Sequence, residues 1–417
     1  MKFWQGLTCS LACAALALMP AVHVEAASVS GRSSTVLEWF DTANEDTAVP
    51  AFQYLQLNVK DIGADGYNIY SYGRLGYDLA DELSNNSNYA DSRLYLAYLE
   101  KREFLTSALD FRLGRQFIST TAGASVMDGL RLDYRLMDNY QFTIFGGGDV
   151  AYYEGYSVKD LVLGAELKVN DRFVKDLDLG LSYVAKVDDG YLAMELIGFD
   201  VEYDFNKKFF VYSETQYDYL SDRVSYFLAG ANFYASPRWS GRLEYLYSLP
   251  VFSSTSIYSV FAVDEYEEIM GEATYNIGNG WRTFGRYTHE MYVDFSNANV
   301  IELGVEKRRT ERYSGYLTMV HRSDEDGQDL KGFKLYLAGR FMQQLQAGAG
   351  VEVDVLERQL NYFDDNSTTD DTTSSRYWVD ATWFITSRME LQAKAERIES
   401  DLWDYYNRGR IRLNVTF

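Results

Sequence analysis

Alternation of apolar and polar residues with a period of two recurs along this chain from about residue 35 to its last residue. The C-terminal segment is the clearest case, because apolar and polar positions alternate through Ile411, Arg412, Leu413, Asn414, Val415, Thr416 and Phe417. A period of two places successive side chains on opposite faces of a β-strand. Because the pattern is repeated throughout, it predicts an all-β fold whose strands each have one apolar and one polar face.

The connections between the alternating segments are of two kinds. Short turns mostly alternate with longer polar loops; the turns include 63–66, 138–139, 236–238, 278–280 and 386–388, and the loops include 81–92, 151–159, 323–329 and 363–376. Transmembrane β-barrels show this asymmetry because their turns face the periplasm and their loops face outward. With Thr35–Asp41 as the first strand, the segments predict a single antiparallel transmembrane barrel of about 22 strands, within a range of roughly 20 to 24.

Composition agrees with strands that meet lipid on one face and water on the other. The chain has 35 Tyr, 24 Phe and 7 Trp, yet 24% of its residues are charged. No stretch after the first 26 residues approaches the roughly 18–20 apolar residues that a membrane-spanning helix needs. The formal charge of −22 argues against a nucleic-acid partner, which would require a basic face. Solvated loops and a wet polar face explain this acidity most simply.

The first 26 residues have the features of a signal peptide. Lys2 provides the positive charge, Leu7–Val22 is apolar, and Ala26 ends an acceptable cleavage site, with cleavage after Ala27 as the alternative. Both cysteines, Cys9 and Cys13, would be removed, which excludes disulfides and thiolate metal sites from residues 27–417. We therefore expect export to the outer membrane and one barrel domain over 27–417. No plug domain is expected, because the alternation starts almost at residue 27.

Charged residues on the polar faces are the candidate pore-lining positions. Apolar residues must face lipid, where a charge costs several kcal/mol near the bilayer centre. On this basis a basic wall of Arg74, Arg112, Arg131 and Arg135, together with Asp133, is expected to face water. An acidic wall is expected from Asp200, Glu202, Asp204, Glu214 and Asp218, followed by Arg242 and Glu244. Opposed walls would create a transverse field that sets ion selectivity; charges that only solvate the lumen or pair with each other are the alternative.

The segment from Ile118 to Asp128 is rich in small residues and lies between two basic strands. We expect it to be either an inward-folded constriction loop, with Ser119, Thr120, Ser125 and Asp128 as its polar groups, or an ordinary outer loop. Asp128 could pair with a lumen arginine, and Arg115, which breaks the alternation, is expected at a bulge or near the rim. The apolar loop 250–261 indicates a contact. A final alternating strand that ends in Phe417 resembles the closing strand that the outer-membrane assembly machinery recognises, so Phe417 is expected to act as an assembly signal.

Catalytic and metal-binding patterns are poor. Only His289 and His321 remain after residue 26, without a metalloprotease motif or a nucleophile elbow. The acidic segments 324–327 and 364–366 could bind Ca²⁺ weakly, although solvated acidic loops are the simpler interpretation. The sequence therefore predicts no enzyme, no metal site and no cofactor.

Three motifs carry a family resemblance. Phe111–Phe117 (FRLGRQF), Asp128–Arg135 (DGLRLDYR) and Phe145–Gly147 (FGG) resemble porin-like outer-membrane channels of Gram-negative, metal-respiring proteobacteria. The resemblance implies passive diffusion of small polar or charged solutes, with membrane lipid as the other partner. It also implies an alternative, a barrel that sheathes a multihaem cytochrome as an electron conduit, although the best-known sheath type has an N-terminal Cys-x-x-Cys pair that is missing here. The oligomeric state is left open.

Overall fold

The computed structural model describes residues 27–42, 46–63, 66–80, 90–150, 159–250, 265–294, 296–309, 312–325, 329–359, 369–401 and 403–417. The expected signal peptide, the acidic segment 364–366 and nearly all of the apolar loop 250–261 lie outside these ranges. Among the described residues, no helix is long and apolar enough to cross a membrane.

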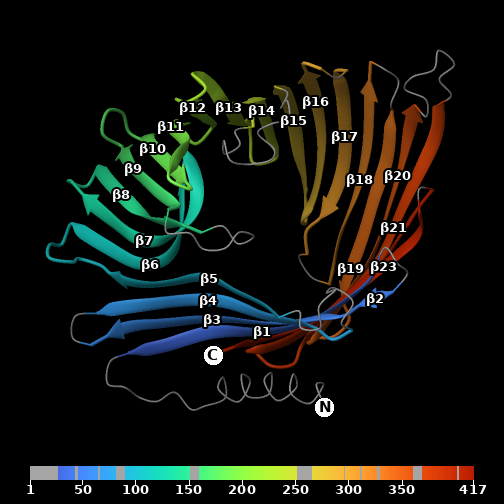
Figure 1. The fold of residues 1–417 in the computed structure, drawn as a ribbon. Coiled ribbons are helices and arrows are strands. Elements are labelled where there is room, and N and C mark those ends of the chain that lie inside the picture. Colours follow the sequence, from blue (N-terminus) through green and yellow to red (C-terminus); the bar gives the residue numbers. More distant parts are fainter. Residues whose placement is uncertain are drawn as a thin grey trace. The chain divides into compact units, whose positions relative to one another are not determined.

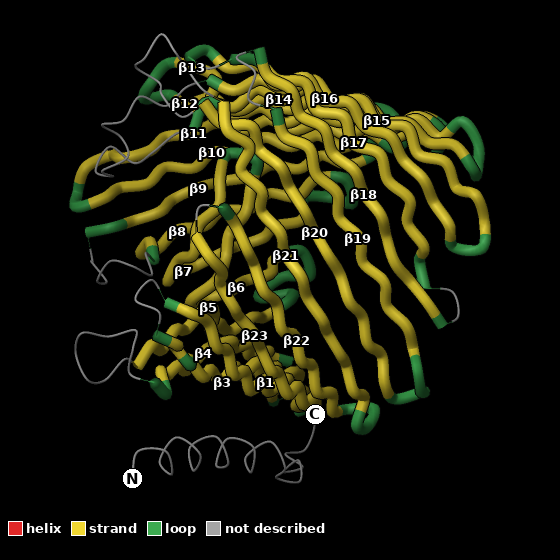
Figure 2. The backbone as a smooth tube through the Cα atoms, turned by 90° about the vertical axis from the view of Figure 1, so that its right-hand side faces the viewer, coloured by secondary structure: helices red, strands yellow, loops and turns green. Residues whose placement is uncertain are grey.

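The secondary structure of the described residues consists of strands and their connections (Figure 2). The first strands are β1 (Ser28–Asp41), β2 (Thr47–Ala48), β3 (Pro50–Ile62), β4 (Tyr67–Asp78), β5 (Ala90–Lys101), β6 (Leu109–Thr120), β7 (Gly123–Arg135) and β8 (Tyr140–Asp149). The next are β9 (Leu161–Asn170), β10 (Leu177–Asp188), β11 (Tyr191–Phe205), β12 (Phe209–Asp218), β13 (Arg223–Tyr234), β14 (Trp239–Ser248), β15 (Tyr266–Gly278) and β16 (Trp281–Tyr292). The last are β17 (Ala298–Lys307), β18 (Tyr313–Asp324), β19 (Leu330–Arg340), β20 (Leu345–Gln359), β21 (Thr369–Phe384), β22 (Met389–Ser400) and β23 (Trp403–Thr416).

The strands belong to one 23-stranded sheet, and every pairing described is antiparallel. The first strand pairs on one side with β3 and on the other with β23, so the two ends of the strand order are hydrogen-bonded to each other. β2, which has two residues, pairs with the end of β1. The remaining 22 long strands have the order of an antiparallel β-barrel, which confirms the predicted all-β class and the predicted number of strands.

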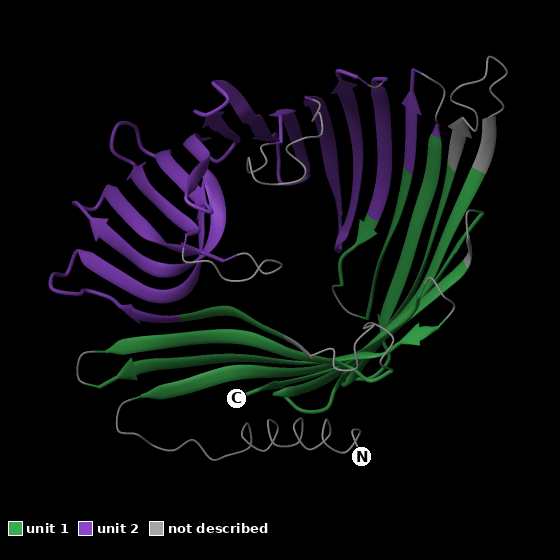
Figure 3. Ribbon diagram, in the orientation of Figure 1, with its two compact units in different colours: residues 1–97, 306–319, 330–417 green, residues 98–305, 320–329 purple. Residues whose placement is uncertain are grey.

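The chain divides into two compact units, which Figure 3 colours separately. Unit 1 comprises residues 1–97, 306–319 and 330–417, and unit 2 comprises 98–305 and 320–329. Within unit 1, β19 to β23 lead through β1 to β3 and β4. Within unit 2, β6 to β16 follow one another in sequence order, and β7, β8 and β9 curve strongly (Figure 1).

Each strand has two chemically different faces, as the alternation predicted. In β9, Leu163 is 54% exposed on one face, whereas Glu166 on the other face is 6% exposed. In unit 1, Leu337 of β19 is 62% exposed, and Lys334, three residues earlier, lies on the opposite face, paired with Glu352. We call the two sides the apolar face and the polar face. Exposed leucines in water would be unfavourable, so the apolar face requires an apolar surrounding.

Two sequence predictions of element bounds were wrong. The first strand begins at Ser28, not at Thr35, because cross-strand hydrogen bonds to β3 extend it through a stretch of small polar residues. The segment 118–128, expected as a loop, is the end of β6 and the start of β7, and only Thr121 and Ala122 form its turn. Arg115 lies at no bulge, because the β6–β7 register is continuous.

Candidate functional site on the polar faces

Three glycines, one each on β6, β7 and β8, lie side by side across the sheet. Gly114 pairs with Gly129, which in turn pairs with Gly147. A methyl carbon added at Gly129 would lie 2.1 Å from the carbonyl oxygen of Gly146, and one at Gly147 would lie 2.5 Å from the Cα of Gly129. Glycine permits this backbone approach because it has no side chain. The glycines of the FGG and DGL motifs therefore have a structural role.

The tip of the β6–β7 hairpin is bound to the polar face of β10 and β11. The hydroxyl of Thr121 donates a hydrogen bond to Oδ1 of Asp200 at 2.5 Å, and the backbone N–H of Ala122 donates to Oγ of Ser182 at 2.8 Å. A methyl carbon at Gly198 would lie only 2.2 Å from the Ala122 nitrogen. Since β8 and β9 separate β7 from β10 in the sheet, the tip crosses two intervening strands on their polar side.

An apolar core holds the hairpin in this position. The buried residues of the core come from the hairpin and from the polar faces of β8 to β11: Ile118, Ala122, Met127, Phe145, Val162, Val184 and Leu196. Burying one such large side chain contributes about 1.5–3 kcal/mol. An apolar patch on the polar faces would be unfavourable if it were exposed to water. The hairpin that covers this patch explains why it is there.

Three of the four arginines predicted for the basic wall lie in unit 2, and each of these three has a carboxylate partner. Arg112 pairs with Glu100 at 2.8 Å, Arg131 with Asp133 at 2.8 Å, and Arg135 with Asp110 at 3.2 Å. Arg74 lies in unit 1, where its guanidinium carbon is 4.7 Å from the centroid of the Phe52 ring. The three paired arginines therefore contribute little net positive charge, in agreement with the alternative that charges on this wall compensate one another.

Four of the residues predicted for the acidic wall and its continuation have local partners. Asp204 and Asp218 cap turns: Asp204 accepts from the N–H of Lys207 at 2.7 Å, and Asp218 accepts from the hydroxyl of Ser221 at 2.6 Å. Arg242 and Glu244 form an ion pair with each other.

The remaining three carboxylates lie close to the hairpin tip. Asp200 and Glu214 are register partners on β11 and β12, and Glu202 follows Asp200 on the same face. Among the described residues, none of the three has a cation partner, although Asp200 accepts the hydrogen bond from Thr121. Uncompensated negative charge is therefore concentrated at the hairpin tip.

The residues predicted for the constriction loop lie on both faces of the hairpin. Thr120 donates to the carbonyl of Gly123 at 3.1 Å, and the buried Ser125 donates to Asp149. Ser119 is exposed near the end of β6. Asp128 pairs with Arg115 at 2.6 Å, on the same face as Leu113 and Leu130 and opposite to Arg112 and Arg131. The predicted pairing of Asp128 with a polar-face arginine therefore does not occur.

Sequence reasoning missed the partners that fix this arrangement. Ser182 and Gly198, which receive the hairpin tip, have no recognisable signal in the sequence because they are small residues within ordinary strands. Glu100 and Asp149 lie at the ends of strands, and Asp149 also pairs with Lys186 at 3.3 Å. Alternation could have placed Glu100 on a face of its strand, but its pairing with Arg112 depends on which strands lie side by side.

Phe417 joins the first and last strands. Its backbone N–H donates to the carbonyl of Gly31 at 3.1 Å, and the N–H of Gly31 donates to the Phe417 carbonyl at 2.9 Å. The Phe417 ring covers Gly31, where an added methyl carbon would lie 2.5 Å from a ring atom. Its predicted role as an assembly signal stays a prediction.

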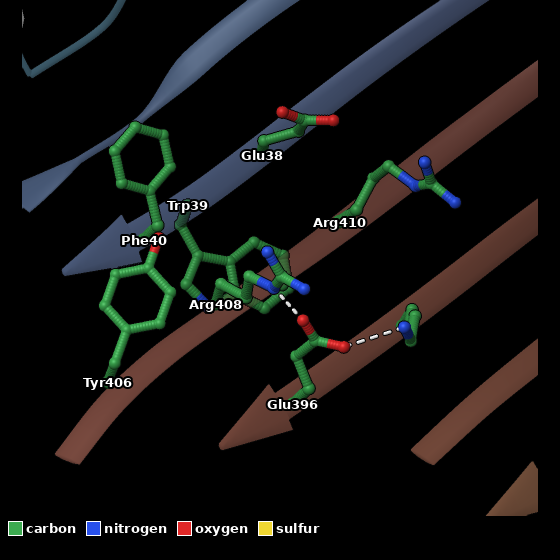
Figure 4. Close-up of a pocket in the computed structure, with 9 residues that line it drawn as sticks. Glu38, Trp39, Phe40, Glu396, Tyr406, Arg408 and Arg410 are labelled. Atoms are coloured by element: carbon green, nitrogen blue, oxygen red, sulfur yellow. Dashed lines mark ion pairs between the residues drawn. The ribbon is translucent and has the colours of Figure 1, made fainter. Parts of the chain in front are cut away.

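Unit 1 contains a cavity of about 460 Å³ on β1, β22 and β23, shown in Figure 4. Glu396, with a side chain only 3% exposed, lines this cavity, and its carboxylate pairs with Lys394 at 2.7 Å and with Arg408, which also line it. The same carboxylate pairs with Arg376 at 2.9 Å. These four charged groups come from three different strands, so the ion pairs also join β21, β22 and β23. Within the described parts of the chain, no group of three or more His, Cys, Asp or Glu residues could hold a metal ion.

Comparison with known proteins shows distant similarities of structure only. No family model and no curated protein matches the chain. The structure of Pseudomonas aeruginosa OpdQ matches with a TM-score of 0.47 and 11% identity over 94% of this chain and 99% of that chain. P. aeruginosa OccD3 (OpdP) matches with a TM-score of 0.45 and 12% identity, over 94% and 91% of the two chains. P. aeruginosa OccK7 (OpdD) has a TM-score of 0.44 and 11% identity, over 94% and 99%.

These likenesses are too weak to carry an argument about this chain. None of the three names mentions a metal-respiring organism or a cytochrome, so they give no support to that family resemblance or to the cytochrome sheath.

Proposed function

We propose that residues 27–417 form an outer-membrane channel for the passive diffusion of small polar solutes. The strand order of a barrel and the apolar face of each strand support a location in a bilayer, since backbone groups in lipid must be paired within the protein. The polar faces, with their ion pairs and unpaired carboxylates, would then line a wet lumen.

One observation carries the proposal: the β6–β7 hairpin is docked on the polar side of the sheet. If the polar faces line a lumen, a hairpin bound across β8 to β11 occupies part of it and reduces the space open to solutes. The apolar core and the hydrogen bonds from Thr121 and Ala122 would keep that constriction in place. The hairpin would thus be a fixed filter of a diffusion channel.

Trimming the hairpin tests the channel and its constriction together. Replacement of Ser119–Ala124 by Gly-Gly should raise the single-channel conductance in planar bilayers, because the turn no longer covers β10 and β11. The wild-type chain should give discrete conductance steps. Folded, membrane-inserted protein without any steps would contradict the channel, and an unchanged step size in the trimmed variant would contradict the constriction.

Charge at the hairpin tip should make the channel prefer cations. Asp200, Glu202 and Glu214 are uncompensated, and carboxylates that line a pore favour cations. The double change Glu202→Gln with Glu214→Gln should shift the reversal potential under a salt gradient towards anions, most strongly at low ionic strength, where screening is weak.

The matched control removes the same charge from the other face. Glu195 of β11 shares its face with Ile197 and Phe199, and Glu399 of β22 pairs with Arg397 on the apolar face. Glu195→Gln with Glu399→Gln should leave the reversal potential nearly unchanged. Equal shifts in the two double variants would refute a local effect of the carboxylates at the hairpin tip.

A further inference from the structure

The cavity in unit 1 contains two unused charges of opposite sign. Glu38 of β1 and Arg410 of β23 both line it. Among the described residues, neither side chain makes a hydrogen bond or an ion pair. In Figure 4, a dashed line joins Glu396 to Arg408, whereas none reaches Glu38 or Arg410. Lys394 also pairs with Glu396, at 2.7 Å. The other charges of the cavity are therefore already engaged with Glu396.

The positions of Glu38 and Arg410 are fixed by the sheet. The two residues are direct register partners on β1 and β23, and Arg410 is also the partner of Lys394 on β22. Side chains of directly paired residues are within about 5.5 Å at their Cβ atoms. One carboxylate and one guanidinium are thus presented side by side on the same polar face, with a second cation close to Arg410.

The opposite side of the cavity is aromatic. Phe40 and Tyr406 both line it, and their rings lie together at one side of the view in Figure 4, away from Arg410. Phe40 is the register partner of Arg408, one step along the same face from Glu38 and Arg410. The cavity therefore combines an anion, a cation and an apolar surface within a volume typical of small-molecule sites, about 300–1,000 Å³.

We propose that this cavity binds a zwitterionic α-amino acid with an apolar side chain. Arg410 would bind the carboxylate of the solute, and Glu38 would bind its ammonium group. The apolar side chain would contact Phe40 and Tyr406. This site specifies the class of solute that the channel would carry. Its role for a permeating solute rests on the proposed channel function.

Solutes of one charge fit this arrangement less well. A simple carboxylate would leave the carboxylate of Glu38 beside another anion, and a simple amine would leave Arg410 beside another cation. A zwitterion satisfies both groups with charge-assisted hydrogen bonds, which are worth more than neutral ones. Wild-type protein should therefore bind L-phenylalanine at least about tenfold more tightly than either singly charged analogue.

Calorimetry on the full-length, detergent-purified chain tests the assignment of the two charges. The probes are L-phenylalanine, 3-phenylpropionate, which lacks the ammonium group, and 2-phenylethylamine, which lacks the carboxylate. Glu38→Gln should weaken the binding of phenylalanine about tenfold or more, but it should not weaken the binding of 3-phenylpropionate. Arg410→Gln should weaken the binding of phenylalanine and of 3-phenylpropionate but not the binding of 2-phenylethylamine.

The controls are Glu399→Gln and Arg397→Gln, which remove the same charges from the apolar face and should not change binding. Wild-type binding of 3-phenylpropionate as tight as that of phenylalanine would overturn the zwitterion in favour of a plain anion site. Absence of binding by all three probes would overturn the site itself. Calorimetry measures binding independently of conductance. Absence of conductance steps would therefore contradict the channel function without affecting the calorimetric test of the binding site.

Discussion

Leu130→Arg with Leu132→Arg should abolish insertion of the folded protein into membranes. Both leucines lie on the apolar face of β7, opposite to Arg131 and Asp133. An arginine that faces lipid costs about 2–4 kcal/mol near the bilayer centre. Two such changes are comparable with the whole stability of many proteins, about 5–15 kcal/mol. The measurement is the heat-modifiable electrophoretic shift of the chain after folding into lipid vesicles.

The matched control introduces the same two arginines on the polar face. Glu202→Arg with Glu214→Arg should still fold and insert, because each new cation lies beside the carboxylate of Asp200 and would face water. In bilayers this variant should also lose its cation preference. If the polar-face variant failed to insert while the Leu130 and Leu132 variant inserted normally, the two faces would have been assigned the wrong way round.

Gly198→Val should detach the β6–β7 hairpin from the polar face of β10 and β11. A methyl carbon at Gly198 would meet the backbone of the turn, 2.2 Å from the Ala122 nitrogen and 2.5 Å from the Thr121 carbonyl carbon. Backbone at this distance cannot be displaced by a change of rotamer, so the hairpin must move. Overpacking of this kind costs about 1–3 kcal/mol, and here it is relieved by losing the hydrogen bonds from Thr121 and Ala122.

Hydrogen exchange measures the detachment. The backbone amides of 118–127 should exchange roughly tenfold to a hundredfold faster in the Gly198 variant, because local opening becomes easier by the same free energy. Gly271→Val is the matched control, since nothing lies within 4 Å of a methyl carbon at Gly271 in β15. Protection of 118–127 that was equal in both variants would contradict the docked hairpin.

The sequence was sufficient for the class of fold because the signal for it is local. In a strand, neighbouring residues must point to opposite faces, so Leu130 and Leu132 identify one face of β7 and Arg131 identifies the other without any knowledge of the tertiary structure. The same rule repeated along the chain gave the number of strands. It failed at Ser28–Ser34 and at Ser119–Val126, where small residues on both faces give a weak contrast and hydrogen bonding to a neighbouring strand decides the conformation.

Only the tertiary structure decided which of the polar-face residues are free to act. Alternation placed Arg131 and Glu202 equally on that face, but it contained no information about their partners, because these depend on register and on which strands lie side by side. Arg131 is neutralised by Asp133, whereas Glu202 has no cation partner among the described residues. Likewise, Ser182 and Gly198 acquire their role through a turn about 60 to 80 residues away in sequence.

The same distinction applies to the cavity of unit 1. Glu38 and Arg410 come from the two ends of the chain, and each is an ordinary charged residue within an alternating segment. Pairing of β1 with β23 brings Glu38 and Arg410 together. Because Arg376, Lys394 and Arg408 pair with Glu396, they do not pair with Glu38. A period of two determines the face on which a side chain lies; its neighbours on that face are set by hydrogen bonds between strands that are distant in sequence.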